Sequence, residues 1–228
     1  MDLQRDVVTN MVAKSDFDRL VEWELEKSKK DETLFSLVAL DLDGYGKICE
    51  QLGVEASEDL LRRLAEILRT HTREGDVLAK GRSDKFFLLL CKTGPDQGLL
   101  FVEDLRRLLS NSTIKLDSAG AQLSVHVSFS AGVSSFPKDG TTREEIQRKA
   151  DIALYRAKTS GRNRVCLAAA EKSVLKSNYY LKSQLERLSV LAKALERTEA
   201  SLLREAIDDL FDRFESVLKG HPVDGGSA

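Results

Sequence analysis

Apolar runs of strand length alternate with amphipathic helical segments along about the first 165 residues of the chain. The longest apolar runs, at residues 35–40 and 86–91, fit buried strands, and the second forms a predicted hairpin with residues 77–79. Residues 122–129 alternate in hydrophobicity and predict one half-buried strand. Helical spacing of apolar residues marks four segments, which are residues 16–29, 57–70, 95–109 and 142–158. The alternation predicts an α/β sandwich whose sheet is antiparallel or mixed.

The composition argues against several classes of protein. No apolar run approaches the roughly 20 residues that span a bilayer, and the N-terminus turns charged at once, so we expect a cytoplasmic protein without a membrane partner. Cys49, Cys91 and Cys166 are widely spaced and lack nearby histidines, which argues against a disulfide framework or a zinc site. A net charge of −2 supplies no global basic field, so any contact with nucleic acid requires a local patch.

The pattern changes after Val165, where a short basic strand-like stretch is followed by two amphipathic helices. About 45 residues are too few to bury two apolar helix faces, which predicts a homodimer or a higher oligomer. We therefore expect a first domain at residues 1–168, a dimerising module at 169–220 and a disordered tail at 221–228.

Three collinear stretches of the first domain resemble the GGDEF family of diguanylate cyclases. They are D-V-V-T-N-M-V-A-K-S-D-F at residues 6–17, D-L-D-G-Y at residues 41–45, and A-D-I-A-L-Y-R-A-K-T-S-G-R-N at residues 150–163. The closing stretch is the most specific of the three. The resemblance implies a nucleotidyl-cyclase-like α/β sandwich, GTP as the substrate class and cyclic di-GMP as a regulatory ligand.

Four charged residues form a candidate site for metal and phosphate. Asp41 ends a predicted strand and suits magnesium, which is usually held by one or two carboxylates and substrate phosphates, and Asp84 is the candidate second ligand. Lys158 and Arg162 are four residues apart, so on a helix they share a face that meets a triphosphate. The alternative, which periodicity alone favours, is that Asp41 caps a turn and that Lys158 and Arg162 belong to a solvated helix face.

The signature loop departs from the family pattern. Where G-G-D-E-F is expected, the chain reads Arg82-Ser83-Asp84-Lys85-Phe86. The family's glycines permit unusual dihedral angles and a close approach to phosphates, and Lys85 replaces an acid that helps to activate the attacking hydroxyl. Two guanine-reading positions also differ, at Cys49 and Glu58. We expect a catalytically inactive domain that binds magnesium only if GTP binds.

A second motif has the position of the family's inhibitory site for cyclic di-GMP. Arg73-Glu-Gly-Asp76 is an R-x-x-D separated by five residues from the signature loop. Arginine forks onto a phosphate or a guanine edge, and aspartate accepts from guanine N–H groups. The alternative is a local Arg–Asp pair at a helix end. Arg106 or Arg107 is a loose candidate for a further arginine at this site.

Residues 174–218 resemble a ribbon-helix-helix DNA-binding module. In a strand, Lys176, Asn178 and Tyr180 face one side, where the family's ribbons read base edges in the major groove of a palindromic operator. Lys172 extends the basic ribbon, and Thr198 as N-cap leaves the N–H groups of the second helix for a DNA phosphate. The alternative is a helical hairpin used only for dimerisation, because residues 171–219 hold nine Lys/Arg and nine Asp/Glu.

Together these patterns predict a transcriptional regulator in which cyclic di-GMP on the first domain alters DNA binding by a dimeric C-terminal module. Two alternatives remain open at this point. One is an active diguanylate cyclase with a DNA-binding tail, and the other is a dimeric adaptor that senses cyclic di-GMP without binding DNA.

Overall fold

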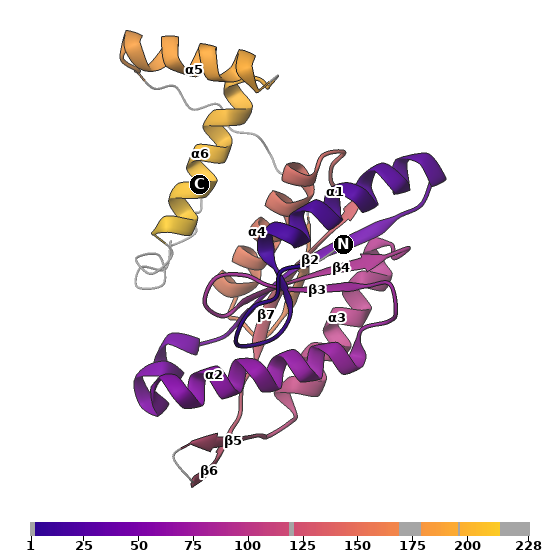
Figure 1. Ribbon diagram of the computed structural model, residues 1–228, viewed down its shortest axis with the longest axis vertical. Coiled ribbons are helices and arrows are strands. Elements are labelled where there is room, and N and C mark those ends of the chain that lie inside the picture. Colours follow the sequence, from indigo (N-terminus) through magenta and orange to yellow (C-terminus); the bar gives the residue numbers. More distant parts are fainter. Residues whose placement is uncertain (1–2, 119–120, 169–178, 196, 215–228) are drawn as a thin grey trace. The chain divides into compact units, whose positions relative to one another are not determined.

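The computed structural model describes residues 3–118, 121–168, 179–195 and 197–214 (Figure 1). Contacts divide the chain into two units, Met1–Ala170 and Glu171–Ala228, and each is considered by itself. In the described residues, no helix is both long enough and apolar enough to cross a membrane.

The first unit is built on a six-stranded mixed sheet with the strand order β1-β3-β4-β2-β7-β8. Its strands are β1 (Val12–Ala13), β2 (Phe35–Leu42), β3 (Val77–Lys80), β4 (Lys85–Cys91), β7 (Phe129–Phe136) and β8 (Val165–Leu167). The β1–β3 and β7–β8 pairs are parallel, and the other pairs are antiparallel. The prediction of a mixed sheet is confirmed, as is the hairpin of β3 and β4.

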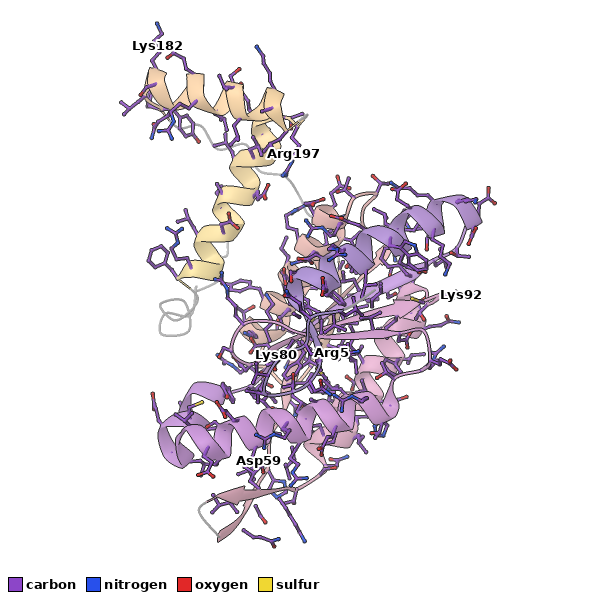
Figure 2. All side chains as sticks on the ribbon, viewed as in Figure 1. Arg5, Asp59, Lys80, Lys92, Lys182 and Arg197 are labelled. Carbon is purple, nitrogen blue, oxygen red and sulfur yellow. The ribbon has the colours of Figure 1, made fainter. Side chains whose placement is uncertain are left out.

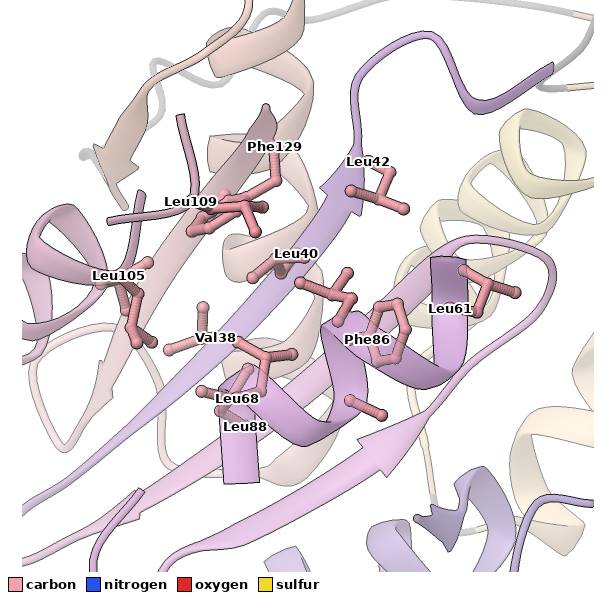
Figure 3. Close-up of a cluster of buried hydrophobic side chains, with 14 of the residues drawn as sticks. Val38, Leu40, Leu42, Leu61, Leu68, Phe86, Leu88, Leu105, Leu109 and Phe129 are labelled. Atoms are coloured by element: carbon pink, nitrogen blue, oxygen red, sulfur yellow. The ribbon is translucent and has the colours of Figure 1, made fainter. Parts of the chain in front are cut away.

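Four helices cover the two faces of the sheet. On one face, α2 (Tyr45–His71) and α3 (Pro95–Ser110) pack against Val38, Leu40 and Leu42 of β2, in the apolar cluster of Figure 3. On the other, α1 (Lys14–Asp31) and α4 (Arg143–Thr159) pack against Phe35, Leu37 and Ala39. All eight residues of β2 are buried, so this strand is the centre of the fold.

The predicted strand at residues 122–129 is wrong in its extent. Residues Ala121–Val125 form β6, which pairs with β5 (Ile114–Ser118) in a separate two-stranded sheet, and β7 begins only at Phe129. β7 escaped prediction because its sequence, F-S-A-G-V-S-S-F, is small and serine-rich where helices press on it. A Cβ on Gly132 would lie 2.0 Å from the Ala150 carbonyl oxygen, so glycine lets α4 approach the sheet closely.

The second unit contains two helices, α5 (Lys182–Ala194) and α6 (Glu199–Arg213), where two helices were predicted. The ribbon residues Lys172, Lys176 and Asn178 lie outside the described residues, so the ribbon itself stays a prediction. Tyr180 is described and has no regular secondary structure. Among the described residues of this unit, only Ala192 and Leu202 are buried apolar side chains.

Candidate functional site

Two carboxylates meet at the end of the sheet where the signature loop joins β3 to β4. Asp41 is the next-to-last residue of β2 and pairs in register with Lys85, the first residue of β4. Asp84 directly precedes β4, and both aspartates are almost fully buried. The structure therefore brings together the two predicted metal ligands.

Lys158 from α4 completes this cluster. Its Nζ lies 2.9 Å from Asp41 Oδ2, so Lys158 lies beside the two predicted metal ligands. Burial raises the pKa of Asp41 to about 7; the negative charge of Asp84 adds to the rise, and the ammonium of Lys158 opposes it. Asp41 is thus a strongly perturbed carboxylate whose charge is balanced within the protein.

A second lysine at this end, Lys80, was missed by the sequence reasoning. It is the last residue of β3, is 7% exposed, and donates hydrogen bonds to the carbonyl oxygens of Gly81 and Ser83 (Figure 2). Burial lowers the pKa of Lys80, while Asp6, Asp84 and Asp41 act in the opposite direction. A lone lysine closing an apolar strand just before the loop was the available signal.

Lys85 does not point at the two aspartates. Its Nζ lies 3.0 Å from Asp151 Oδ1 on α4 and 5.4 Å from the ring centroid of Phe87. Successive residues of a strand face opposite sides, so Asp84 and Lys85 diverge, and Phe86 turns into the core. Lys85 therefore replaces the family's acid, as the sequence indicates, but its own positive charge pairs with Asp151 on α4.

The signature loop keeps a glycine-like backbone without a glycine. Ser83 has a φ of 49°, in the left-handed region, although a serine was expected to obstruct such a conformation. Arg82 and Ser83 are both exposed, and the Lys85 N–H donates to the Arg82 carbonyl oxygen at 3.0 Å. The turn therefore has a left-handed residue at Ser83 and exposes the side chains of Arg82 and Ser83.

Arg162 is not on the same helix face as Lys158. The helix α4 ends at Thr159, and Arg162 lies beyond it, exposed and with a φ of 60°. The following loop is tied to Asp43, whose carboxylate accepts from the Asn163 N–H at 2.9 Å and from two serine hydroxyls. The predicted shared face is wrong because Gly161, with a φ of 113°, follows the helix end.

The positions predicted to have lost guanine reading lie on α2. Cys49 is half-buried and Glu58 is exposed. Between them, the Tyr45 hydroxyl donates to the Ser57 carbonyl oxygen at 3.4 Å and contacts Cys49, and burial raises the pKa of this tyrosine. At the position where the family has an asparagine amide, this chain therefore has the Cys49 thiol beside the Tyr45 hydroxyl.

The R-x-x-D turn lies at the opposite end of the β3–β4 hairpin from the signature loop. Asp76 Oδ2 accepts from the Arg73 N–H at 3.3 Å, and Oδ1 accepts from the Cys91 N–H at 3.0 Å. Burial raises the pKa of Asp76 despite these two bonds. The Arg73 side chain is exposed. Asp76 thus has a structural role in the turn, and Arg73 extends toward solvent.

Arg106 is not a third residue of the R-x-x-D turn. Its guanidinium donates to Glu103 and, at 2.7 Å, to Asn163 Oδ1. The backbone N–H of Asn163 is in turn bound by Asp43, at the end of the sheet that carries the signature loop. Arg107 also pairs with Glu103. The contact with Asn163 places Arg106 at the signature end of the sheet, whereas Arg73 lies at the opposite end of the β3–β4 hairpin.

Magnesium fits this site only in a limited way. Within the described part of the chain, no group of three or more His, Cys, Asp or Glu side chains is arranged to hold a metal ion. Asp41 and Asp84 supply two carboxylates, and Lys158 already contacts one of them. The pair therefore fits magnesium only together with phosphate oxygens from a nucleotide.

The family is shown by comparison with known proteins. The model of the family described as "Diguanylate cyclase, GGDEF domain" matches residues 3–164, so the chain belongs to the GGDEF family. It is 31% identical over 200 residues to the bifunctional diguanylate cyclase/cyclic di-GMP phosphodiesterase MucR of Pseudomonas aeruginosa, covering 86% of this chain and 27% of MucR. It is 30% identical to diguanylate cyclase A of Treponema denticola, covering 72% of this chain and 44% of that protein. The chain thus spans less than half the length of these relatives.

Solved structures show the same fold. The GGDEF domain of TpbB (YfiN) from Pseudomonas aeruginosa aligns with a TM-score of 0.68 at 24% identity, covering 73% of this chain and 95% of that one. The GGDEF domain of DgcB from Caulobacter crescentus, solved in complex with c-di-GMP, aligns with a TM-score of 0.68 at 22% identity, covering 75% and 96%. The predicted cyclase-like α/β fold is confirmed for the first unit.

Proposed function

We propose that this protein is a cyclic di-GMP-responsive regulator whose GGDEF domain binds the dinucleotide at Arg73 and Asp76 without making it. In this proposal the C-terminal unit transmits the response by binding a palindromic DNA operator as a homodimer. The observation that carries the loss of synthesis is the ion pair of Lys85 with Asp151. Lys85 stands where the family has a carboxylate, and its side chain is directed to α4 instead of to the site.

Two further features support the loss of synthesis. The Nζ of Lys158 lies 2.9 Å from Asp41 Oδ2, so a metal ion would compete with this lysine for the Asp41 carboxylate. The side chains of Arg82 and Ser83 cover the turn that the family leaves as bare backbone. Residual binding of GTP with magnesium, through Asp41, Asp84, Lys158 and Arg162, is compatible with all of these features.

The ligand site is supported by the difference between its two residues. Asp76 is fixed by two backbone N–H groups, so it holds the shape of the turn. Arg73 is exposed and therefore accessible to a phosphate or a guanine edge. A rigid turn that presents a solvent-facing arginine suits an anionic dinucleotide.

DNA binding is supported by the basic ribbon and by the start of α6. The sequence has no acid between Lys172 and Lys182, and Lys176, Asn178 and Tyr180 alternate along it. The Thr198 carbonyl oxygen accepts from the Leu202 N–H at 3.2 Å, which is the bond expected of an N-cap residue. The N–H groups at the N-terminus of α6 are suitable for contact with a DNA phosphate.

Dimerisation is supported by apolar exposure and by charge. Leu185, Leu191, Leu195, Ile207 and Leu210 are each about half exposed, which is unfavourable for a lone helix pair. By sequence, α5 has three Lys/Arg and one Glu, whereas α6 has two Arg and five acids. Oppositely charged helices with unburied apolar faces are complementary to those of a second copy.

Incubation with GTP and magnesium tests the enzymatic part of the proposal. We expect no cyclic di-GMP above background by chromatography, whereas clear turnover supports the alternative of an active cyclase. Gel shifts against genomic fragments, with and without cyclic di-GMP, test the output. If neither condition shows preference for any sequence, the alternative of a non-DNA adaptor holds.

Two ribbon variants sharpen the test of DNA binding. Asn178→Ala removes a base contact and should erode operator preference while weak nonspecific binding persists. Lys172→Ala removes a phosphate contact and should weaken binding to all sequences and reduce its salt dependence. If both variants bind operator and nonspecific DNA like the parent protein, the ribbon does not contact DNA.

A further inference from the structure

The helix α1 exposes the chain's single tryptophan. Trp23 is 59% exposed, although its neighbours Val21, Glu24 and Leu25 are buried against the sheet. Tryptophan is the largest aromatic side chain, and its exposure forfeits much of the free energy that burial would provide. The core of the first unit is complete without this ring, so its position calls for another explanation.

The ring of Trp23 is oriented by a charged neighbour. Lys27, one turn later, places its Nζ 5.0 Å from the ring centroid. The same Nζ lies 3.5 Å from Glu24 Oε2, and Glu24 is buried. The tryptophan face is therefore backed by a lysine that is itself anchored to the body of the domain.

This part of α1 adjoins the R-x-x-D turn. The Cys91 thiol donates to the Gly75 carbonyl oxygen at 3.2 Å, and the Cys91 N–H donates to Asp76 Oδ1. The carboxylate of Glu24 lies close enough to this thiol to help raise its pKa. Cys91 thus joins the turn directly to the helix segment that presents Trp23 and Lys27. Lys92, next in sequence, is exposed at the same end of the hairpin (Figure 2).

We infer that Trp23 is a stacking platform for a guanine base of the cyclic di-GMP whose other groups contact Arg73. This inference rests on the proposed ligand site and adds a binding residue from α1. A guanine face stacks on the exposed indole, and the arginine contacts the phosphate or the Hoogsteen edge. Lys27 supplies positive charge beside the anionic phosphates of the ligand. The combination explains why an aromatic residue and a cation are both kept at the surface here.

The single tryptophan makes the inference directly measurable. Cyclic di-GMP is titrated into the full chain while tryptophan emission and, separately, calorimetric heat are recorded. Stacking predicts saturable quenching whose midpoint equals the calorimetric Kd. Trp23→Ala should weaken binding about tenfold or more, and Trp23→Phe, which keeps a stacking ring, should stay within a few-fold of the parent protein.

Tyr155→Ala is the matched control, because Tyr155 is another exposed aromatic residue of the same domain, on α4. It should bind cyclic di-GMP like the parent protein, and all variants should unfold at similar temperatures. If Trp23→Ala retains full affinity while Arg73→Ala loses it, the platform is refuted and the ligand site stands. If the parent protein shows no binding at all, both the platform and the ligand site are refuted.

Discussion

The two units of the chain differ in how far they bury their apolar side chains and pair their charged ones. In the GGDEF domain, apolar residues on both faces of β2 are buried, and the buried Asp41 has its counter-charge in Lys158. In the C-terminal unit, the described apolar side chains are buried only at Ala192 and Leu202. The first unit therefore has a complete core, whereas the second leaves most of its described apolar side chains exposed, as the proposed dimer requires. This difference is what the proposed regulator, with a ligand-binding first unit and a dimeric second unit, would show.

The largest effect is expected where the second unit is predicted to be open to a second copy. Leu191→Glu places a carboxylate in the proposed dimer surface. Removing an unpaired charge from water there costs roughly several kcal/mol. We expect a dimer of the parent protein to become a monomer in analytical ultracentrifugation. Val7→Glu, at an exposed residue of the first unit, should remain dimeric. A dimeric Leu191→Glu protein would place the interface elsewhere.

The next effect concerns the protonation of the buried Asp41 and the pH dependence of stability that follows from it. The folded-state pKa of about 7 lies above the ordinary value of 3.8, so between these values the folded protein binds a proton that the unfolded chain does not. The free energy of unfolding contributed by Asp41 should fall by up to about 1.4 kcal/mol per pH unit as pH rises from about 4 to about 7.

Urea unfolding at several pH values measures this contribution as the difference between the parent protein and Asp41→Asn. The difference should change through this window and be constant above it. Asp31→Asn, at an exposed aspartate, is the control and should show no such trend. A difference that does not depend on pH would mean that Asp41 is charged throughout.

The two residues of the R-x-x-D turn should differ in their effect on stability. Asp76→Ala leaves two backbone N–H groups without an acceptor and should lower the free energy of unfolding by about 1–3 kcal/mol. Arg73→Ala removes an exposed side chain and should change it by less than about 0.5 kcal/mol. Chemical unfolding of the two variants compares them. Equal losses of stability would show that Arg73 is also part of the folded framework.

The smallest effect is expected in the signature loop. Ser83→Gly relieves a left-handed serine at the cost of a more flexible unfolded chain, for a net gain of about 0.5 kcal/mol. Ser15→Gly, in the first turn of α1, should instead destabilise by about 0.5–1 kcal/mol. Thermal unfolding distinguishes the two signs. The Ser83→Gly variant should gain no cyclase activity because Lys85 remains, and recovered turnover would contradict that reasoning.

Local patterns predicted the parts of this molecule that depend on neighbours in sequence. The alternation of apolar runs indicated β2, and Asp41 followed from its place near the end of that strand. The β3–β4 hairpin brought Asp84 alongside because a hairpin is a local structure. The family resemblance added Lys158, whose contact with Asp41 spans more than a hundred residues.

Contacts between distant segments explain what the sequence did not predict. The partner of Lys85 is Asp151 on α4, and no spacing rule relates the two. The extent of β7 depends on Gly132 accepting α4 against the sheet. Arg162 was misplaced because helical spacing was extended past Thr159, although Ser160 and Gly161 signal a helix end. Arg106 was only a loose candidate for the R-x-x-D turn, because local patterns do not give the direction of α3.

Isothermal titration of cyclic di-GMP into the full chain, purified free of nucleotide, tests the central claim most directly. The account predicts saturable binding that Arg73→Ala weakens about tenfold to a hundredfold, since losing a charge-assisted partner costs about 1.5–3 kcal/mol. Glu74→Ala, at an exposed residue of the same turn, should bind like the parent protein. Absence of binding, or equal affinity of the Arg73→Ala and parent proteins, would contradict the account.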